Sequence, residues 1–212
     1  MIKGILKGVG PMELEKALMR IRDVLGAILG IIISIIPIMV VGILVKLDGG
    51  PIFFKQKRIG INGKPFVMWK IRSMVTDAEN KKSNLIKYSD VEGMFKMKND
   101  PRVTKIGGFI RKHSIDELPQ FWNVLKGDMS LVGPRPALPS EFNNYSERDK
   151  IRLRVLPGMT GLWQVSGRNN VDFQTMIDLD LFYVANRSFV DDLNILFKTI
   201  ILLFPSSKNG AY

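Results

Sequence analysis

"VLGAILGIIISIIPIMVVGILV", residues 24–45, contains no charged side chain over 22 positions, and this run decides how the rest of the chain can be arranged. An α-helix needs roughly 20 apolar residues to cross the hydrocarbon core of a bilayer, so the run is long enough to do so. A secretory signal peptide would be shorter and followed by a small-residue cleavage site. The run therefore predicts a helix that enters a membrane, rather than a leader or a core helix.

Both flanks of this run are basic, which bears on how it meets the membrane. Because basic residues favour the cytoplasmic side, we expect both ends there. Pro37 lies inside the run, and an internal proline bends or breaks a helix. We therefore predict a re-entrant helix-break-helix within residues 1–47, beginning near Pro11, and a kinked helix that spans the bilayer is the alternative. The basic flanking residues are Lys16, Arg20 and Arg22 before the run and Lys46, Lys55, Lys57 and Arg58 after it.

The segments after the apolar run predict an α+β fold that is mostly helical. Runs of bulky residues at Ile52–Phe54 and Phe66–Ile71 flank the turn signal Asn62-Gly63, a pattern typical of a β-hairpin. Residues 76–99 are polar and predict a loop or a surface helix. A last helix, which packs in the core or lies in the membrane interface, is indicated by apolar residues at helical spacing: Leu193, Leu196, Phe197, Ile200, Ile201 and Phe204.

The net charge of +11 is unevenly distributed, because residues 55–112 alone carry 15 basic and 5 acidic side chains. Nucleic acid, anionic headgroups and phosphorylated substrates would all be attracted to such a segment. The chain has no cysteine and a single histidine, His113, which excludes thiol chemistry and multi-histidine metal sites. Neither a dinucleotide-binding glycine pattern nor a P-loop is present.

"RKHSIDELPQFW", residues 111–122, places two adjacent carboxylates, Asp116 and Glu117, behind a basic triplet. The pattern fits a capping box in which Ser114 caps a helix and Glu117 reaches back. Asp116 is the alternative cap, because Pro119 would then fall in the first turn, where it is tolerated. Both interpretations place the pair at a helix start, whose free N–H groups suit a carboxylate or a phosphate. The local pattern does not separate a cap from a reaction centre.

Four longer segments resemble the bacterial sugar transferases, the monotopic phosphoglycosyl transferases. They are "GGPIFFKQKRIG", "FVMWKIRSM", "IRKHSIDELPQFWNVLKGDMSLVGPRP" and "LPGMTGLWQVSGRN", and they occur in the order and spacing of that family. The resemblance covers roughly residues 13–204. It implies that residues 48–212 form a small cytoplasmic catalytic domain with a short β-hairpin and interfacial helices. The helix-break-helix of residues 1–47 would hold this domain at the cytoplasmic face of the bacterial inner membrane.

The resemblance also implies a reaction. A UDP-sugar would donate its phosphosugar to a polyprenyl phosphate such as undecaprenyl phosphate, in the first membrane step of polysaccharide or glycoconjugate synthesis. The family's paired acids fall on Asp116 and Glu117. Its aspartate attacks the sugar-proximal phosphate, forms a covalent phosphosugar-enzyme and releases UMP. Mg²⁺ is the family's cofactor, and we expect Asp116 to be its protein ligand.

Substrate binding is expected from five basic residues: Lys70, Arg72, Arg111, Arg135 and Arg168. Phosphoryl transfer needs charge neutralisation more than proton chemistry, which agrees with the basic segment. One departure concerns the membrane helix, since some relatives break it at Ser-Pro, whereas here Ile36 precedes Pro37 and the nearest serine is Ser34. Membrane lipid is an expected partner, while the sugar, the pathway and a homodimer stay open.

Two other classes of protein compete with this interpretation. A nucleic-acid-binding module would explain the charge, but no RNP-type aromatic motif or zinc spacing is present and the apolar run would have no role. A non-catalytic scaffold that grips anionic lipid through residues 55–112 is the second. We expect no nucleic acid partner.

Overall fold

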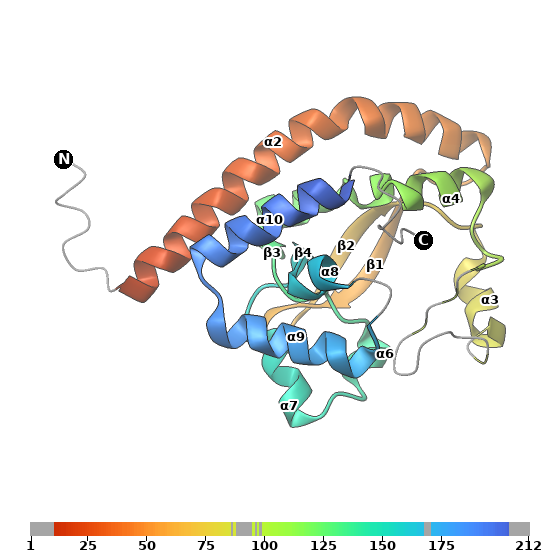
Figure 1. The fold of residues 1–212 in the computed structure, drawn as a ribbon. Coiled ribbons are helices and arrows are strands. Elements are labelled where there is room, and N and C mark those ends of the chain that lie inside the picture. The colour runs from red at the N-terminus through yellow and green to blue at the C-terminus, as the bar shows by residue number, and fades with distance from the viewer. Residues whose placement is uncertain are drawn as a thin grey trace.

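The computed structural model describes residues 11–85, 87, 95, 97, 99–167 and 171–203. One long helix, α2 (Pro11–Leu47), arches over a body of mixed helices and strands, and α10 (Phe189–Leu203) lies beside α2 (Figure 1). The mostly helical α+β fold expected from the sequence is confirmed.

Helix α2 begins at Pro11, as predicted, with Glu13 in its first turn and Lys46 in its last, a distribution that suits the helix dipole. The predicted break at Pro37 is wrong, because the helix continues through Pro37 to Leu47. A proline in a helix removes one donor and pushes away one carbonyl, and a gradual bend accommodates both. The curvature of α2 is visible in Figure 1.

A single seam of α2 packs along the body from one end of the helix to the other. Its side chains recur every three or four residues, which is the spacing of one helix face. The seam is buried and consists of Met19, Asp23, Ala27, Ser34, Val41 and Val45. Two glycines continue it: a Cβ at Gly26 would lie 2.5 Å from Leu131, and one at Gly30 would lie 2.5 Å from Phe121.

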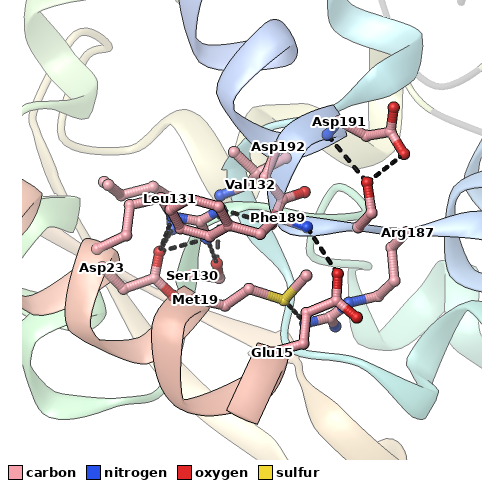
Figure 2. A network of polar contacts seen from close by, with 12 residues as sticks. Glu15, Met19, Asp23, Ser130, Leu131, Val132, Arg187, Phe189, Asp191 and Asp192 are labelled. Carbon is pink, nitrogen blue, oxygen red and sulfur yellow. Dashed lines mark hydrogen bonds and ion pairs between the residues drawn. The ribbon is translucent and has the colours of Figure 1, made fainter. Parts of the chain in front are cut away.

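Polar contacts fix the N-terminal half of α2 (Figure 2). Arg22 pairs with Asp192 of α10 at 2.5 Å, and Asp23 accepts a hydrogen bond from the N–H of Leu131 at 3.1 Å. Arg20 donates to the carbonyls of Val124 and Leu125, both at 2.8 Å. These two carbonyls are in the last turn of α5 (Gln120–Lys126), where the helix has few donors of its own, so Arg20 caps the end of that helix.

The predicted β-hairpin is confirmed. Strands β1 (Phe53–Ile59) and β2 (Pro65–Ile71) are antiparallel, with Phe53 opposite Ile71. The short 3₁₀ helix η1 (Ile61–Gly63) joins them, and Asn62 takes the left-handed conformation with φ 54° that the Asn-Gly signal favours. The first strand is longer than its apolar residues suggested, because lysines and arginines occupy it as well.

The remaining elements complete the body around this hairpin. Helix α3 lies in the polar stretch where a loop or surface helix was expected; residues 86, 88–94, 96 and 98 of that stretch lie outside the described residues, as does Phe204 of the predicted last helix. Strands β3 and β4 form a second, parallel pair. The elements are α3 (Ala78–Leu85), α4 (Lys105–Lys112), η3 (Ile115–Glu117), β3 (Ser130–Val132), α6 (Pro139–Phe142), α7 (Glu147–Lys150), η4 (Ile151–Arg154), β4 (Gly158–Thr160), α8 (Leu162–Ser166) and α9 (Phe173–Asn186).

The hairpin shares its core with α2 and α5. Met68 of β2 packs with Ala27 of α2 and Val124 of α5, while Ile71 packs with Val41 and Val45 at the other end of α2. The helix that meets the membrane in our prediction and the strand that carries Lys70 therefore share one core.

Outside its seam, α2 is exposed and apolar. By length and composition it is able to cross a membrane, and only 22% of its most apolar 18-residue stretch is buried, unlike a core helix. Helix α10 presents a second exposed apolar face, with Val190, Leu193, Phe197, Ile200 and Ile201. Faces of this kind indicate association with a membrane.

Candidate active site

Asp116 and Glu117 lie in η3, between α4 and α5, and neither of the predicted caps forms. Ser114 has φ 55° and makes no capping hydrogen bond, and α5 begins only after Pro119, again without a side-chain cap. The 3₁₀ turn satisfies its own backbone: the N–H of Glu117 donates to Ser114 and that of Leu118 to Ile115, both at 3.2 Å. Because the backbone needs no cap there, both carboxylates are available for other contacts.

Those contacts come from Lys70 on β2. Its Nζ lies 2.8 Å from Oε1 of Glu117 and 3.9 Å from Oδ2 of Asp116. The structure thus brings Lys70 to a pair of adjacent acids, of which Glu117 is 47 positions away in the sequence. One ammonium held between two carboxylates is a preorganised charge cluster, and not an incidental surface pair.

The two carboxyl groups differ in protonation. Burial raises the pKa of Asp116 to about 6, helped by the charge of Glu117 and opposed by Lys70 and Arg111. The pKa of Glu117 is lowered: burial works against this, but Lys70, Arg58 and Arg135 outweigh it. The cations prevail at Glu117 because Lys70 is hydrogen-bonded to it at 2.8 Å, whereas the same ammonium lies 3.9 Å from Asp116. A buried carboxyl group with a pKa near neutrality, next to a carboxylate that stays ionised, marks a candidate reaction centre.

Arg111 of α4 acts on Asp116 through its charge. Among the described residues it makes no ion pair, and it is partly exposed, so its guanidinium is available to an anionic ligand. His113 does not join the site; its Nδ1 lies 2.9 Å from the carbonyl oxygen of Phe109 on its own helix.

Arg58 of β1 is a site residue that our reading of the sequence missed. It is buried, donates to Pro136 O at 2.9 Å, and its charge reaches Glu117. Burial and the neighbouring charge of Arg135 lower the pKa of Arg58 to about 9, so it still carries its proton at neutral pH. Strand alternation was the available signal, since Phe54 lies opposite Lys70 and Arg58 falls on the same face four residues later.

Arg135 lies on the Glu117 side of the site and pairs with Glu141 at 3.0 Å. A buried network supports the loop that carries it. Arg152 donates to Arg135 O at 3.2 Å and to the Tyr145 hydroxyl at 2.5 Å, and it pairs with Asp180. This network fixes the backbone of Arg135 while 23% of its side-chain surface stays exposed.

Two of the expected substrate-binding residues are not part of this cluster. Arg72 is buried and donates to the carbonyls of Val45 and Pro51, each at 2.8 Å, and to that of Gly49. It ties the end of α2 to the hairpin, and the structure does not bring it to the carboxylates. Arg168 lies outside the described residues.

The metal-binding capacity of the site is limited but compatible with Mg²⁺. Within the described ranges no group of three or more His, Asp or Glu side chains could hold a metal ion by itself. Mg²⁺ is commonly bound by one or two carboxylates together with substrate phosphates. Asp116, beside a diphosphate, fits that donor set.

Comparison with known proteins identifies the family. The model of the bacterial sugar transferase family matches residues 14–206, so the chain belongs to that family. Similar proteins include a UDP-galactose-lipid carrier transferase of Erwinia amylovora, 44% identical over 204 residues, which are 93% of this chain and 42% of that protein. An undecaprenyl-phosphate galactose phosphotransferase of Salmonella typhimurium is 44% identical over 203 residues, 93% of this chain and 42% of that protein.

A third relative is closer to this chain in length. The exopolysaccharide production protein ExoY of Sinorhizobium fredii is 44% identical over 184 residues, which are 84% of this chain and 81% of that protein. The chain therefore spans about two fifths of the first two relatives and about four fifths of the third.

Proposed function

We propose that the chain transfers a sugar phosphate from a UDP-sugar to a polyprenyl phosphate such as undecaprenyl phosphate and releases UMP. The observation that carries this proposal is the contact of Lys70 with both Asp116 and Glu117, among cations from α4 and β1. The names of the relatives, which include a UDP-sugar, a lipid carrier and undecaprenyl phosphate, support the donor and the acceptor. The reaction would open a polysaccharide or glycoconjugate pathway.

Asp116 is the proposed nucleophile. Its carboxylate oxygen forms a bond to the sugar-proximal phosphorus while the bond from that phosphorus to the UMP oxygen breaks, and UMP leaves with the electron pair. A phosphate oxygen of the lipid then attacks the same phosphorus and releases the carboxylate. Two steps through a carboxylate nucleophile divide one difficult transfer into two easier ones.

The cations would neutralise the charge that these steps gather on phosphate oxygens. Lys70 holds Glu117 in its ionised form and limits the freedom of Asp116, and Arg111 offers its donors to the donor diphosphate. Arg135 and Arg168 stay predicted contacts of the donor. Mg²⁺, held by Asp116 and the diphosphate, would supply further charge neutralisation when bound.

For the membrane, we propose monotopic attachment at the cytoplasmic face of the inner membrane. The seam of α2 supports this topology, because both ends of the helix rest on the same charged body. Crossing the bilayer would pull one end off that body or draw buried charges such as Asp23 into lipid, which is unfavourable. The exposed faces of α2 and α10 would then lie in the same leaflet.

The test uses a panel of UDP-sugars labelled in the sugar, incubated with the protein without lipid acceptor. We expect free UMP together with label on a peptide that contains Asp116, and transfer of that label to lipid when undecaprenyl phosphate is added. Asp116→Asn should lower turnover by on the order of 10³-fold or more, as removal of a nucleophile does. Asp178→Asn is the control, because this carboxylate is exposed and pairs with Arg148 away from the cluster.

Other outcomes would contradict the proposal in distinct ways. UMP that forms only with lipid phosphate, without labelled protein, would indicate direct transfer and remove the covalent role of Asp116. If no UDP-sugar gave UMP, with or without lipid phosphate, the proposal that the chain is a sugar phosphate transferase would be contradicted. Salt-sensitive capture of RNA, or of anionic vesicles, would then favour one of the competing classes.

A further inference from the structure

The loop that carries Arg135 has little backbone freedom, because the four consecutive carbonyls of residues 134–137 each accept a hydrogen bond from another segment. The donors, which come from β4, η4 and β1, are the N–H of Gly158 to Pro134 O at 2.9 Å, Arg152 to Arg135 O at 3.2 Å, Arg58 to Pro136 O at 2.9 Å and the N–H of Ile59 to Ala137 O at 2.9 Å. A proline on each side of Arg135 restricts the backbone further. What remains to be oriented at Arg135 is its side chain.

Two observations connect this loop with the carboxylates. Arg58, which binds the loop, projects from the same face of the hairpin as Lys70, because Lys70 is opposite Phe54 and Arg58 is four residues after it. Burial would raise the pKa of Glu117, but the lysine and, after it, the charges of Arg58 and Arg135 lower it. Arg135 therefore belongs to the cationic surroundings of the candidate active site.

Glu141 of α6 is a buried carboxylate that fixes the Arg135 side chain. Its oxygens Oε1 and Oε2 lie 3.3 and 3.0 Å from Nη1 of Arg135, and Oε2 also accepts a hydrogen bond from the N–H of Leu138 at 2.8 Å. Burial would raise its pKa, but Arg135, the Leu138 N–H and Arg58 lower it, so the carboxyl group is ionised at neutral pH. An anion beside a centre for phosphate transfer subtracts positive charge, so its contribution is to the geometry of Arg135 and not to charge neutralisation.

The contact with Glu141 leaves one edge of the Arg135 guanidinium available. Within the described residues all hydrogen bonds of this side chain come from Nη1, and none from Nε or Nη2. The side chain keeps 23% of its surface exposed. The N–H groups of Nε and Nη2 are parallel and match two oxygens of one phosphate group. A carboxylate that binds Nη1 therefore presets the other edge for an anionic ligand.

We propose that Glu141 is a positioning residue, which holds Arg135 so that its Nε–Nη2 edge binds a phosphate group of the UDP-sugar. This inference rests on the proposed function, and it assigns a role to a buried acid that the transfer reaction itself does not use. Because the guanidinium is already oriented in the free protein, less side-chain freedom is lost when the phosphate binds.

Glu141→Gln removes the charge and keeps the shape, since the amide oxygen can still accept the N–H of Leu138. In the full chain in lipid nanodiscs, we expect KM for the UDP-sugar and the dissociation constant of UDP, which has the diphosphate without the sugar, to rise about tenfold. The value of kcat should stay within about twofold, because the lost contact is made to substrate and transition state alike. Glu147→Gln is the control and should change neither value, since this carboxylate is exposed on α7 and pairs with Lys150 at 2.7 Å.

A double-mutant cycle distinguishes positioning from a purely structural role. In the Arg135→Gln background, Glu141→Gln should weaken UDP binding no further, because the residue through which it acts has been removed. A role in packing, or in holding the start of α6, would instead cost the same factor in both backgrounds.

Arg135→Lys tests the free edge without any change at Glu141. The lysine keeps a positive charge for Glu141 to pair with, but it has no second pair of parallel donors. We expect the dissociation constant of UDP to rise about tenfold in this variant as well, because one point charge replaces a bidentate contact.

The outcomes separate this inference from the proposed function. An unchanged dissociation constant of UDP in Glu141→Gln, an equal loss in both backgrounds, or wild-type affinity in Arg135→Lys would each overturn the role of Glu141, whether or not the chain transfers sugar phosphate. A chain that binds UDP with the expected differences but releases no UMP would contradict only the proposed function. A wild-type chain that binds no UDP would contradict both.

Discussion

The raised pKa of Asp116 has two consequences of opposite sign. Burial favours its neutral form, so its pKa is about 6 in the folded protein, against roughly 4 in an unfolded chain. As the proposed nucleophile, Asp116 must be ionised, so we expect kcat/KM to fall as pH decreases through about 6. The acid limb of the rate profile, recorded at UDP-sugar concentrations well below KM, measures this.

Stability should move the other way. Between pH 4 and 6 the folded state binds more protons at Asp116 than the unfolded state does, so this group's contribution to the free energy of unfolding decreases as pH rises through about 6. Asp116→Asn removes the titration. Denaturant unfolding of the metal-free protein should therefore show the variant gaining stability relative to the wild type as pH rises over this window. A constant difference between the two would contradict the pKa shift.

Asn123 joins α5 to the hairpin. It is fully buried; its amide donates to Val67 O at 2.7 Å and accepts from the N–H of Trp69 at 3.1 Å. The Asn123 side chain thus makes hydrogen bonds to the β2 backbone of the kind that a neighbouring strand would make, directly before Lys70. Asn123→Leu leaves both backbone groups unpaired, which should lower the free energy of unfolding by about 3 kcal/mol.

The control for this change is Asn186→Leu. Asn186 is exposed on α9 and makes one hydrogen bond, to Phe182 O at 2.9 Å, so its replacement should change stability by no more than about 0.5 kcal/mol. Denaturant unfolding in detergent compares the two variants. A similar small loss in both would show that Asn123 does not hold β2 against α5.

Pro37 lies where α2 curves over the body. Leucine at this position restores the missing hydrogen bond and favours a straighter helix, because the proline disfavours a straight interior by about 3 kcal/mol. A straight α2 cannot keep the Arg22–Asp192 pair at one end and the packing of Val45 on Ile71 at the other. Pro37→Leu should therefore reduce folded protein or move one flank across the membrane. Unchanged yield, topology and activity would show that the curve of α2 does not depend on Pro37.

Local chemistry explains which elements the sequence could predict. The hairpin followed from Asn62-Gly63, and the start of α2 from Pro11 and its acidic first turn, since these signals act within a few residues. The caps of η3 could not be predicted in this way, because a 3₁₀ turn closed its own backbone. The pair of Arg22 with Asp192 and the anchoring of Arg72 join distant segments, and no pattern in one sequence reports such contacts. Arg58 lies between these cases, since strand alternation would have found it.

We predict that both ends of α2 face the cytoplasm. The chain has no cysteine, so Lys16→Cys and Lys55→Cys each introduce a single thiol. In intact cells both thiols should be shielded from an impermeant reagent, and both should react after permeabilisation. Labelling of just one of them from outside would mean that α2 crosses the bilayer.

The seam of α2 also limits how such a protein can be rearranged. Asp23 and Ser34 are buried against the body, and Gly26 and Gly30 leave no room for a side chain there, so the surface of the helix is specific to this partner. A generic membrane anchor grafted in place of residues 11–47 would leave Leu131 and Asp192 without their partners. We therefore expect that anchors exchanged between relatives will function only together with compensating changes in α5, β3 and α10, so that the membrane helix and the catalytic body are inherited as one unit.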